Sequence, residues 1–130
     1  NPETTFIGAH VAGCAEDLAW VSRMLDTYRN LNVDIAARIA ELGRQPRAAA
    51  ALFRRHPSRV LLGTDEFPPS IATYRIHARL LETADEHFPY SADATPGQGR
   101  WAVSGLDLPD TLLRKVCRDN ALRLIPGLRP

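Results

Sequence analysis

One pattern occurs three times in this sequence: a short apolar run that ends near a polar residue and is followed by a helical or polar segment. The runs occupy residues 5–10, 31–37 and 59–65. Each predicts a buried parallel strand, because strands covered by helices on both faces are almost continuously apolar. The second and third runs begin about 30 residues apart, close to one unit of an eightfold barrel (~250 residues over eight units). The sequence therefore predicts a repeated β/α unit.

The segments between and after these runs predict the helices of the same α/β class. Residues 15–28 carry apolar side chains at three- and four-residue steps, which is the period of an amphipathic helix. Pro46 suits the first turn of a helix over 46–55, and we expect further helices over 71–84 and from 107 to 125. The Pro- and Gly-rich stretch 89–99 predicts a long loop.

Two architectures combine parallel strands with helical crossovers, a doubly wound sheet and a (β/α)8 TIM barrel. Periodicity alone does not separate them. A dinucleotide-binding sheet has little support, because no Gly-x-Gly-x-x-Gly follows any of the runs. All 130 residues are expected to form a single α/β unit.

Composition narrows the classes of partner. A net charge of +1 gives no reason to expect nucleic acid or an anionic membrane, and no apolar stretch approaches the ~20 residues of a membrane span. Cys14 and Cys117 lie far apart without disulfide or metal spacing, which favours reduced thiols in a cytoplasmic protein. We therefore expect a small-molecule substrate, with no nucleic acid and no membrane as partner.

His10 and Asp65 are the candidate catalytic residues, because each ends an apolar run. In α/β barrels the carboxyl ends of the strands carry the chemistry. A neutral imidazole there can bind a metal or act as a general base, and a desolvated carboxylate needs a partner such as a cation. The alternatives are a hydrogen-bonded rim histidine for His10 and a capping carboxylate for Asp65.

Arginines on the connection after the second run are candidates for substrate binding. Arg38 and Arg44 could hold a substrate carboxylate through paired hydrogen bonds, and a solvated charged loop is the equal alternative. For Asp34, inside the second run, we expect a salt bridge to Arg38 or Arg59. His77 is predicted to be exposed on its helix.

Four segments resemble a known family: Thr-Phe-Ile-Gly-Ala-His at 5–10, Leu-Asn-Val-Asp-Ile at 31–35, Arg-Val-Leu-Leu-Gly-Thr-Asp at 59–65, and Asp-Asn-Ala-Leu-Arg-Leu-Ile at 119–125. In this order and spacing they are similar to the C-terminal part of the amidohydrolase superfamily. The closer likeness is to the amidohydrolase-related branch with aminocarboxymuconate semialdehyde decarboxylase-like enzymes. The resemblance spans residues 1–128.

That resemblance implies the C-terminal portion of a (β/α)8 barrel, namely strands 6–8 with their helices. It also implies a bound divalent metal, for which zinc is the expected ion. It also implies that His10 is the strand-6 histidine and Asp65 the strand-8 aspartate, both at the metal. The His-x-His pair that the family carries on strand 1 does not occur in these 130 residues. Because the chain also starts at Asn1 rather than Met, we expect either a missing N-terminal half of the barrel or a homo-oligomer that completes it.

The expected function is a metal-dependent hydrolase that acts on a small acidic, amide or ester substrate through a metal-activated water. Non-oxidative decarboxylation on the same scaffold is one alternative. A non-catalytic partial barrel that pairs with another chain is a second, and a homologue that has lost its activity is a third. On its own the 130-residue chain is expected to be inactive.

Overall fold

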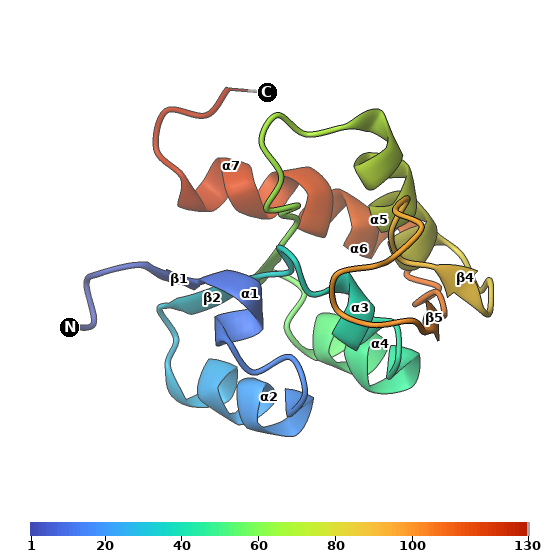
Figure 1. Cartoon of the computed structure of the whole chain (residues 1–130). Helices are drawn as coiled ribbons and strands as arrows, with labels where there is room; N and C mark the ends of the chain where they lie inside the picture. The colour runs from blue at the N-terminus through green and yellow to red at the C-terminus, as the bar shows by residue number, and fades with distance from the viewer. Residues whose placement is uncertain (130) are drawn as a thin grey trace.

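The computed structural model, which describes residues 1–129, contains a three-stranded parallel sheet at its centre (Figure 1). The strands β1 (Phe6–Gly8), β2 (Leu31–Asp34) and β3 (Val60–Leu61) lie side by side in the order β1-β2-β3. Phe6 pairs with Leu31, and Val33 pairs with Val60. All three carboxyl ends therefore meet at one edge of the sheet, which we call the carboxyl edge.

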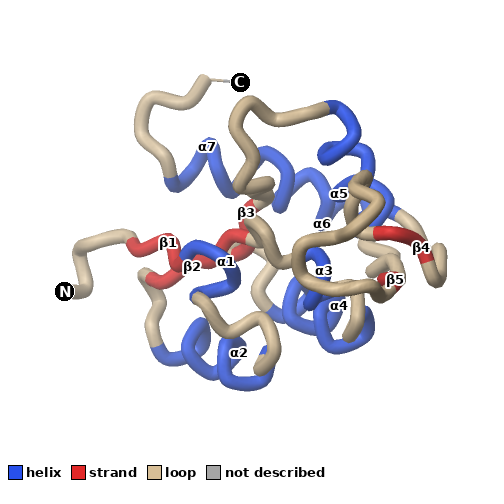
Figure 2. Tube along the Cα trace, viewed as in Figure 1, coloured by secondary structure: helices blue, strands red, loops and turns tan. Residues whose placement is uncertain are grey.

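Helices surround this sheet (Figure 2). They are α1 (Ala9–Ala12), α2 (Leu18–Thr27), α3 (Ile39–Leu42), α4 (Pro46–Arg55), α5 (Ile71–Glu82), α6 (Asp110–Arg114), the π-helical segment η1 (Lys115–Asp119) and α7 (Asn120–Leu124). In the view of Figure 1, α2 and α4 lie below the strands, while the run from α6 to α7 lies above them. Among the described residues, no helix is long and apolar enough to cross a bilayer.

The core lies where β2 and β3 meet these helices. Val33 and Val60 are almost fully buried in the sheet, and Leu25 and Phe53 pack against them from the buried faces of α2 and α4. The α/β class and the helix over 46–55 are thus confirmed. The structure contains no closed barrel within residues 1–129, since its parallel sheet has three strands.

The predicted strands are longer than the observed ones. The first ends at Gly8 because His10, Val11 and Ala12 have φ angles of 59°, 57° and 54°, which form a left-handed turn. A Cβ atom on Gly8 would lie 2.9 Å from the Cβ of Ala12, so only glycine allows the chain to turn this tightly. The second strand ends at Asp34, and the third is reduced to Val60–Leu61.

The helical tail closes the outer edge of β3. In a parallel strand the N–H and C=O groups of alternate residues point to opposite sides. The Leu61 carbonyl accepts from the N–H of Ile35, which follows β2 directly, whereas Leu62 donates its N–H to the Val116 carbonyl of η1 at 3.0 Å. The buried Asn120 side chain donates to the carbonyls of Val60 (2.8 Å) and Pro57 (3.0 Å). Asn120 therefore attaches the tail to β3.

A two-stranded antiparallel sheet, β4 (Phe88–Pro89) with β5 (Ala102–Val103), supports the loop between its strands. That loop folds back over the carboxyl edge: Gln98 donates to the Ala37 carbonyl at 3.0 Å, and the Trp101 indole donates to the Ala40 carbonyl at 3.3 Å. The Tyr90 and Trp101 rings stack with centroids 5.8 Å apart. The long loop predicted over 89–99 is confirmed apart from Pro89, which belongs to β4, and its folding over this edge is a finding of the structure.

Candidate functional site

His10 lies just beyond β1 and is held at the carboxyl edge by two hydrogen bonds. Its backbone N–H donates to the Asp34 carboxylate at 2.9 Å, and its ring Nδ1 lies 2.8 Å from the Ala36 carbonyl. A carbonyl oxygen only accepts, so Nδ1 carries the proton of the neutral ring. Nε2 is then left with a free lone pair. Histidines that bind metals or accept protons are oriented in this way.

Asp34 organises this turn, which corrects the predicted salt bridge to Arg38 or Arg59. One carboxylate oxygen accepts the backbone N–H groups of His10 (2.9 Å) and Ala36 (3.0 Å). Arg59 instead donates to the Asn32 side chain at 3.2 Å and to the carbonyls of Tyr28 and Leu31. Asp34 therefore joins the ends of β1 and β2, and a charged acceptor compensates for the left-handed turn at His10.

Asp65 follows β3 on the same edge, and its side chain is exposed. Its φ of 63° is left-handed, as are those of His10 (59°) after β1 and Ala37 (53°) after β2. Residues other than glycine seldom adopt this conformation, and such strain concentrates at functional sites. All three strands thus lead into a strained residue at the carboxyl edge.

The two candidate ligands do not make up a metal site by themselves. Among residues 1–129, no group of three His, Cys, Asp or Glu side chains is close enough to hold an ion. A catalytic zinc site generally takes three protein ligands. The free Nε2 of His10 and the Asp65 carboxylate suit such a site as partial donors, but the described residues leave it incomplete.

The two predicted substrate-binding arginines have partners within the chain. Arg38 donates to the Ala37 carbonyl at 2.8 Å and lies 3.7 Å from the Glu41 carboxylate. The guanidinium of Arg44 lies over the Trp101 ring, 4.7 Å from its centroid. Their role in holding an acidic substrate stays a prediction.

A cavity of about 430 Å³ opens at the carboxyl edge, lined by Thr64 and Glu66, the chain neighbours of Asp65, and not by Asp65 itself. We call it the edge cavity. Its walls come from the residues after β2, the β3–α5 connection, the start of α5 and the loop over the edge; they are Ala37, Ile39, Thr64, Glu66, Ser70, Thr73, Ile76, His77, Tyr90, Ser91, Ala92, Asp93 and Gln98. Sequence reasoning missed it, because its walls are far apart in the chain.

His77 and Glu66 are the ionisable groups that the β3–α5 segment contributes to this cavity. The prediction that His77 is exposed is wrong: its side chain is 2% exposed. Burial lowers the pKa of His77, opposed in part by the Thr73 carbonyl, the Glu66 charge and the Gly63 carbonyl. The Ser70 backbone N–H, which donates to Glu66 at 2.9 Å, and the Thr73 hydroxyl lower the pKa of Glu66.

A second buried histidine, His56, lies at the opposite end of the strands, where α4 ends just before β3. Its Nε2 is 2.9 Å from the Ser22 hydroxyl and 3.9 Å from the Asp26 carboxylate. Burial lowers the pKa of His56, although the charge of Asp26 opposes this. A serine protease-like relay would need the two partners on different ring nitrogens, so this cluster joins α2 to α4 and is not a catalytic triad.

A parallel α/β unit whose ionisable groups and cavity lie at the carboxyl ends of its strands has the organisation of an α/β enzyme. The family model described as "Amidohydrolase" matches residues 1–127, so the chain belongs to the amidohydrolase family. A search of curated proteins and a search of solved structures found no significant match. Membership supports a hydrolase-type function and implies a TIM-barrel-like fold, in a family that generally uses divalent metals.

Proposed function

We propose that this chain contributes His10 and Asp65 to the active site of a hydrolase that cleaves a small amide or ester. The observation that carries the proposal is the hydrogen bond of 2.8 Å between His10 Nδ1 and the Ala36 carbonyl. It leaves the free lone pair of Nε2 at the same edge as Asp65. One neutral acceptor and one carboxylate at one edge are the groups that hydrolysis of a carbonyl compound requires.

The two side chains have different tasks in this proposal. Asp65 is exposed, which lets its carboxylate accept a proton from the water that attacks the substrate. His10 is half-buried and fixed through its backbone and its ring, so its Nε2 is a positioned acceptor or ligand. The strained backbone at both residues fixes where the two groups lie.

A zinc ion at this edge is part of the proposal, with His10 and Asp65 as two of its ligands. When bound, such an ion polarises a carbonyl and acidifies water. Its remaining ligands must lie outside the described residues, because no group of three ligands occurs within 1–129. An added N-terminal half of the barrel, or a second copy of the chain, would supply them.

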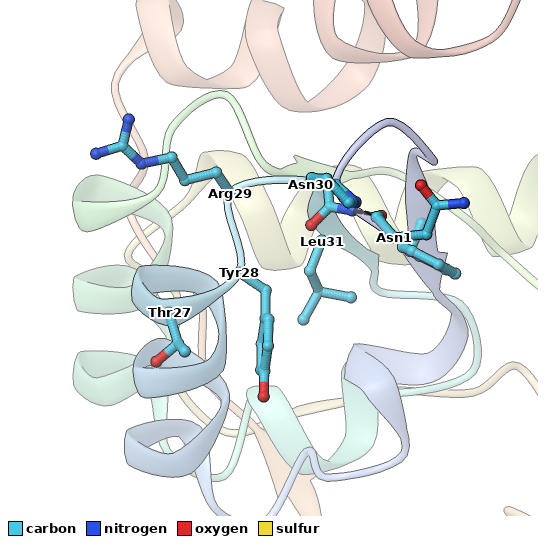
Figure 3. Close-up of a pocket in the computed structure, with 8 residues that line it drawn as sticks. Asn1, Thr27, Tyr28, Arg29, Asn30 and Leu31 are labelled. Carbon is cyan, nitrogen blue, oxygen red and sulfur yellow. Dashed lines mark hydrogen bonds between the residues drawn. The ribbon is translucent and has the colours of Figure 1, made fainter.

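The outer edge of β1 supports this need for further structure. Phe6 and Ile7 point to opposite faces of the sheet, yet their side chains are 48% and 39% exposed. The groove beside this edge, about 800 Å³ in volume, is lined by Phe6, Tyr28 and Leu31 (Figure 3). Asn30 closes one end of it by donating to the Asn1 carbonyl at 2.9 Å. Unpaired strand edges with exposed apolar side chains favour association.

The test compares variants of the chain joined to the segments that complete its site, in a preparation that hydrolyses a panel of amides and esters. Asp65→Asn should lower kcat by about 10²-fold or more without changing the fold, because an amide does not accept the proton. Glu3→Gln, an exposed carboxylate near the N-terminus, is the matched control. Equal turnover in Asp65→Asn and the parent would overturn the proposal.

The same preparation distinguishes hydrolysis from decarboxylation, the alternative reaction that the family resemblance implies. Release of carbon dioxide from a carboxylic acid substrate, with no hydrolysis of amides or esters, would replace the hydrolase by a decarboxylase. A stable dimer without turnover would favour the non-catalytic partial barrel.

A further inference from the structure

We propose that the edge cavity binds the cationic end of the substrate, a protonated amine or an amidinium group. This inference rests on the proposed function in one respect, namely that the occupant is the substrate of the same site. It differs from the acidic substrate that Arg38 and Arg44 suggested, because neither arginine lines the cavity.

The lining of the edge cavity has an excess of hydrogen-bond acceptors. Glu66 and Asp93 contribute carboxylates, the side-chain groups that carry negative charge and accept hydrogen bonds in proteins. No lysine or arginine is among the lining residues in the described part of the chain. An anionic ligand would meet only like charges from ionised side chains here, whereas a cation would neutralise them.

The second observation is the buried imidazole in the cavity wall. His77 Nδ1 lies 2.8 Å from the Thr73 carbonyl, so in the neutral ring Nδ1 carries the proton and Nε2 is an acceptor. Nε2 makes no hydrogen bond within the described residues and His77 is 2% exposed, although the Gly63 carbonyl lies near enough to the ring to raise its pKa. A buried acceptor without a partner is costly unless something donates to it. An ammonium or amidinium N–H is such a donor.

The remaining walls fit the rest of such a molecule. Ile39 and Ile76 supply apolar surface, and the aromatic ring of Tyr90 lies beside them in the lining. Aromatic rings attract cations and pack against apolar groups. The Gln98 side chain, which donates to the Ala37 carbonyl at 3.0 Å, holds the loop in place over the cavity. A volume of about 430 Å³ accommodates a small aromatic or aliphatic amine.

The test measures binding rather than turnover, on the 130-residue chain with labelled histidines. Benzamidinium, benzamide and benzoate share one ring and differ in charge, so they are matched probes. Benzamidinium should shift the His77 ring signals in the NMR spectrum saturably. Benzamide should bind about 10-fold or more weakly, the scale of one charge-assisted hydrogen bond, and benzoate should not shift them at all.

Variants assign the effect to the lining. Glu66→Gln and Asp93→Asn should each weaken benzamidinium binding about 10-fold, whereas Asp85→Asn, a carboxylate that pairs with Arg79 outside the cavity, should leave it unchanged. His77→Phe tests the acceptor. If His77→Phe does not fold, benzamidinium binding by the variants at the exposed Glu66 and Asp93 still tests the proposal.

Two results would overturn the inference: no saturable shift with benzamidinium at about 10 mM, or equal binding of all three probes. Its failure is distinguishable from failure of the hydrolase. If the chain does not prefer benzamidinium over benzamide and benzoate but hydrolysis is unchanged, only the assignment of the edge cavity to a cation is wrong. Cation binding by the chain, with no hydrolysis once the segments that complete its site are present, keeps the pocket and removes the proposed reaction.

Discussion

Replacing Asp34 by alanine tests how the carboxyl edge is held together. One oxygen of this carboxylate accepts the N–H of His10 at 2.9 Å and that of Ala36 at 3.0 Å. A hydrogen bond to a charged group contributes about 1.5–3 kcal/mol net. Asp34 is half-buried, so water replaces part of each bond in the variant. Taking the lower value for both bonds gives a loss of about 3 kcal/mol in the free energy of unfolding.

A loss of this size is large for a domain stabilised by about 5–15 kcal/mol. With a urea dependence of about 1–3 kcal/mol per molar, the midpoint of unfolding should fall by about 1–3 M in Asp34→Ala. Asp34→Asn keeps one acceptor oxygen without the charge, and it should lose only about 1 kcal/mol. Asp85→Ala, which removes an exposed ion pair with Arg79, should cost no more than about 1 kcal/mol.

The assay is urea unfolding followed by circular dichroism, with the slope compared between variants. A change in midpoint at constant slope reports stability alone. If the urea midpoint of Asp34→Ala lies within about 0.3 M of that of the parent at the same slope, the Asp34 carboxylate does not hold the carboxyl edge together.

Asn120→Ala should cost about 1–3 kcal/mol in urea unfolding, because it removes the side-chain donor of the Val60 and Pro57 carbonyls; an unchanged midpoint would contradict this. The free energy of unfolding should fall as pH drops below about 6.5, because the histidines of the unfolded chain gain protons there. In the folded state burial lowers the pKa of His56 and of His77, so these two side chains take up protons only at lower pH. Urea midpoints at pH 7.5 and pH 5 check this, and His56→Gln should flatten the slope; a midpoint independent of pH over this range would count against both burial arguments. His10→Gln should lower kcat in the hydrolysing preparation about 10²-fold, and turnover equal to the parent would remove His10 from the site.

The sequence allowed the sheet and its helices to be predicted, because apolar patterning and chain breakers determine both. The helix over 46–55 was found at its observed bounds because Pro46 starts it and His56-Pro57 follows it. The strand ends were predicted too long, because an apolar run does not reveal the left-handed turn from His10 to Ala12. That turn depends on the distant Asp34 carboxylate, whose partners are backbone N–H groups and leave no pattern in the sequence.

The candidate site was predictable only in part, for a related reason. His10 and Asp65 stand out because polar residues after apolar runs are visible in one dimension. His77 was placed on the wrong face of its helix, because the apolar residues Ile71 and Tyr74 suggested a buried side that is exposed in the structure. The edge cavity depends on the loop before Trp101 folding back onto Ala37 and Ala40, which no local pattern specifies.

Zinc titration of the 130-residue chain, followed through the ring signals of His10, tests whether His10 and Asp65 share a metal site. We expect weak, saturable binding that shifts the His10 signals through Nε2, disappears in Asp65→Asn and is unaffected in Asp85→Asn, with no hydrolysis by the chain alone. Zinc that leaves the His10 signals unchanged would contradict a shared site at the carboxyl edge. Tightly held stoichiometric zinc with turnover in a monomer would contradict the claim that further ligands are required.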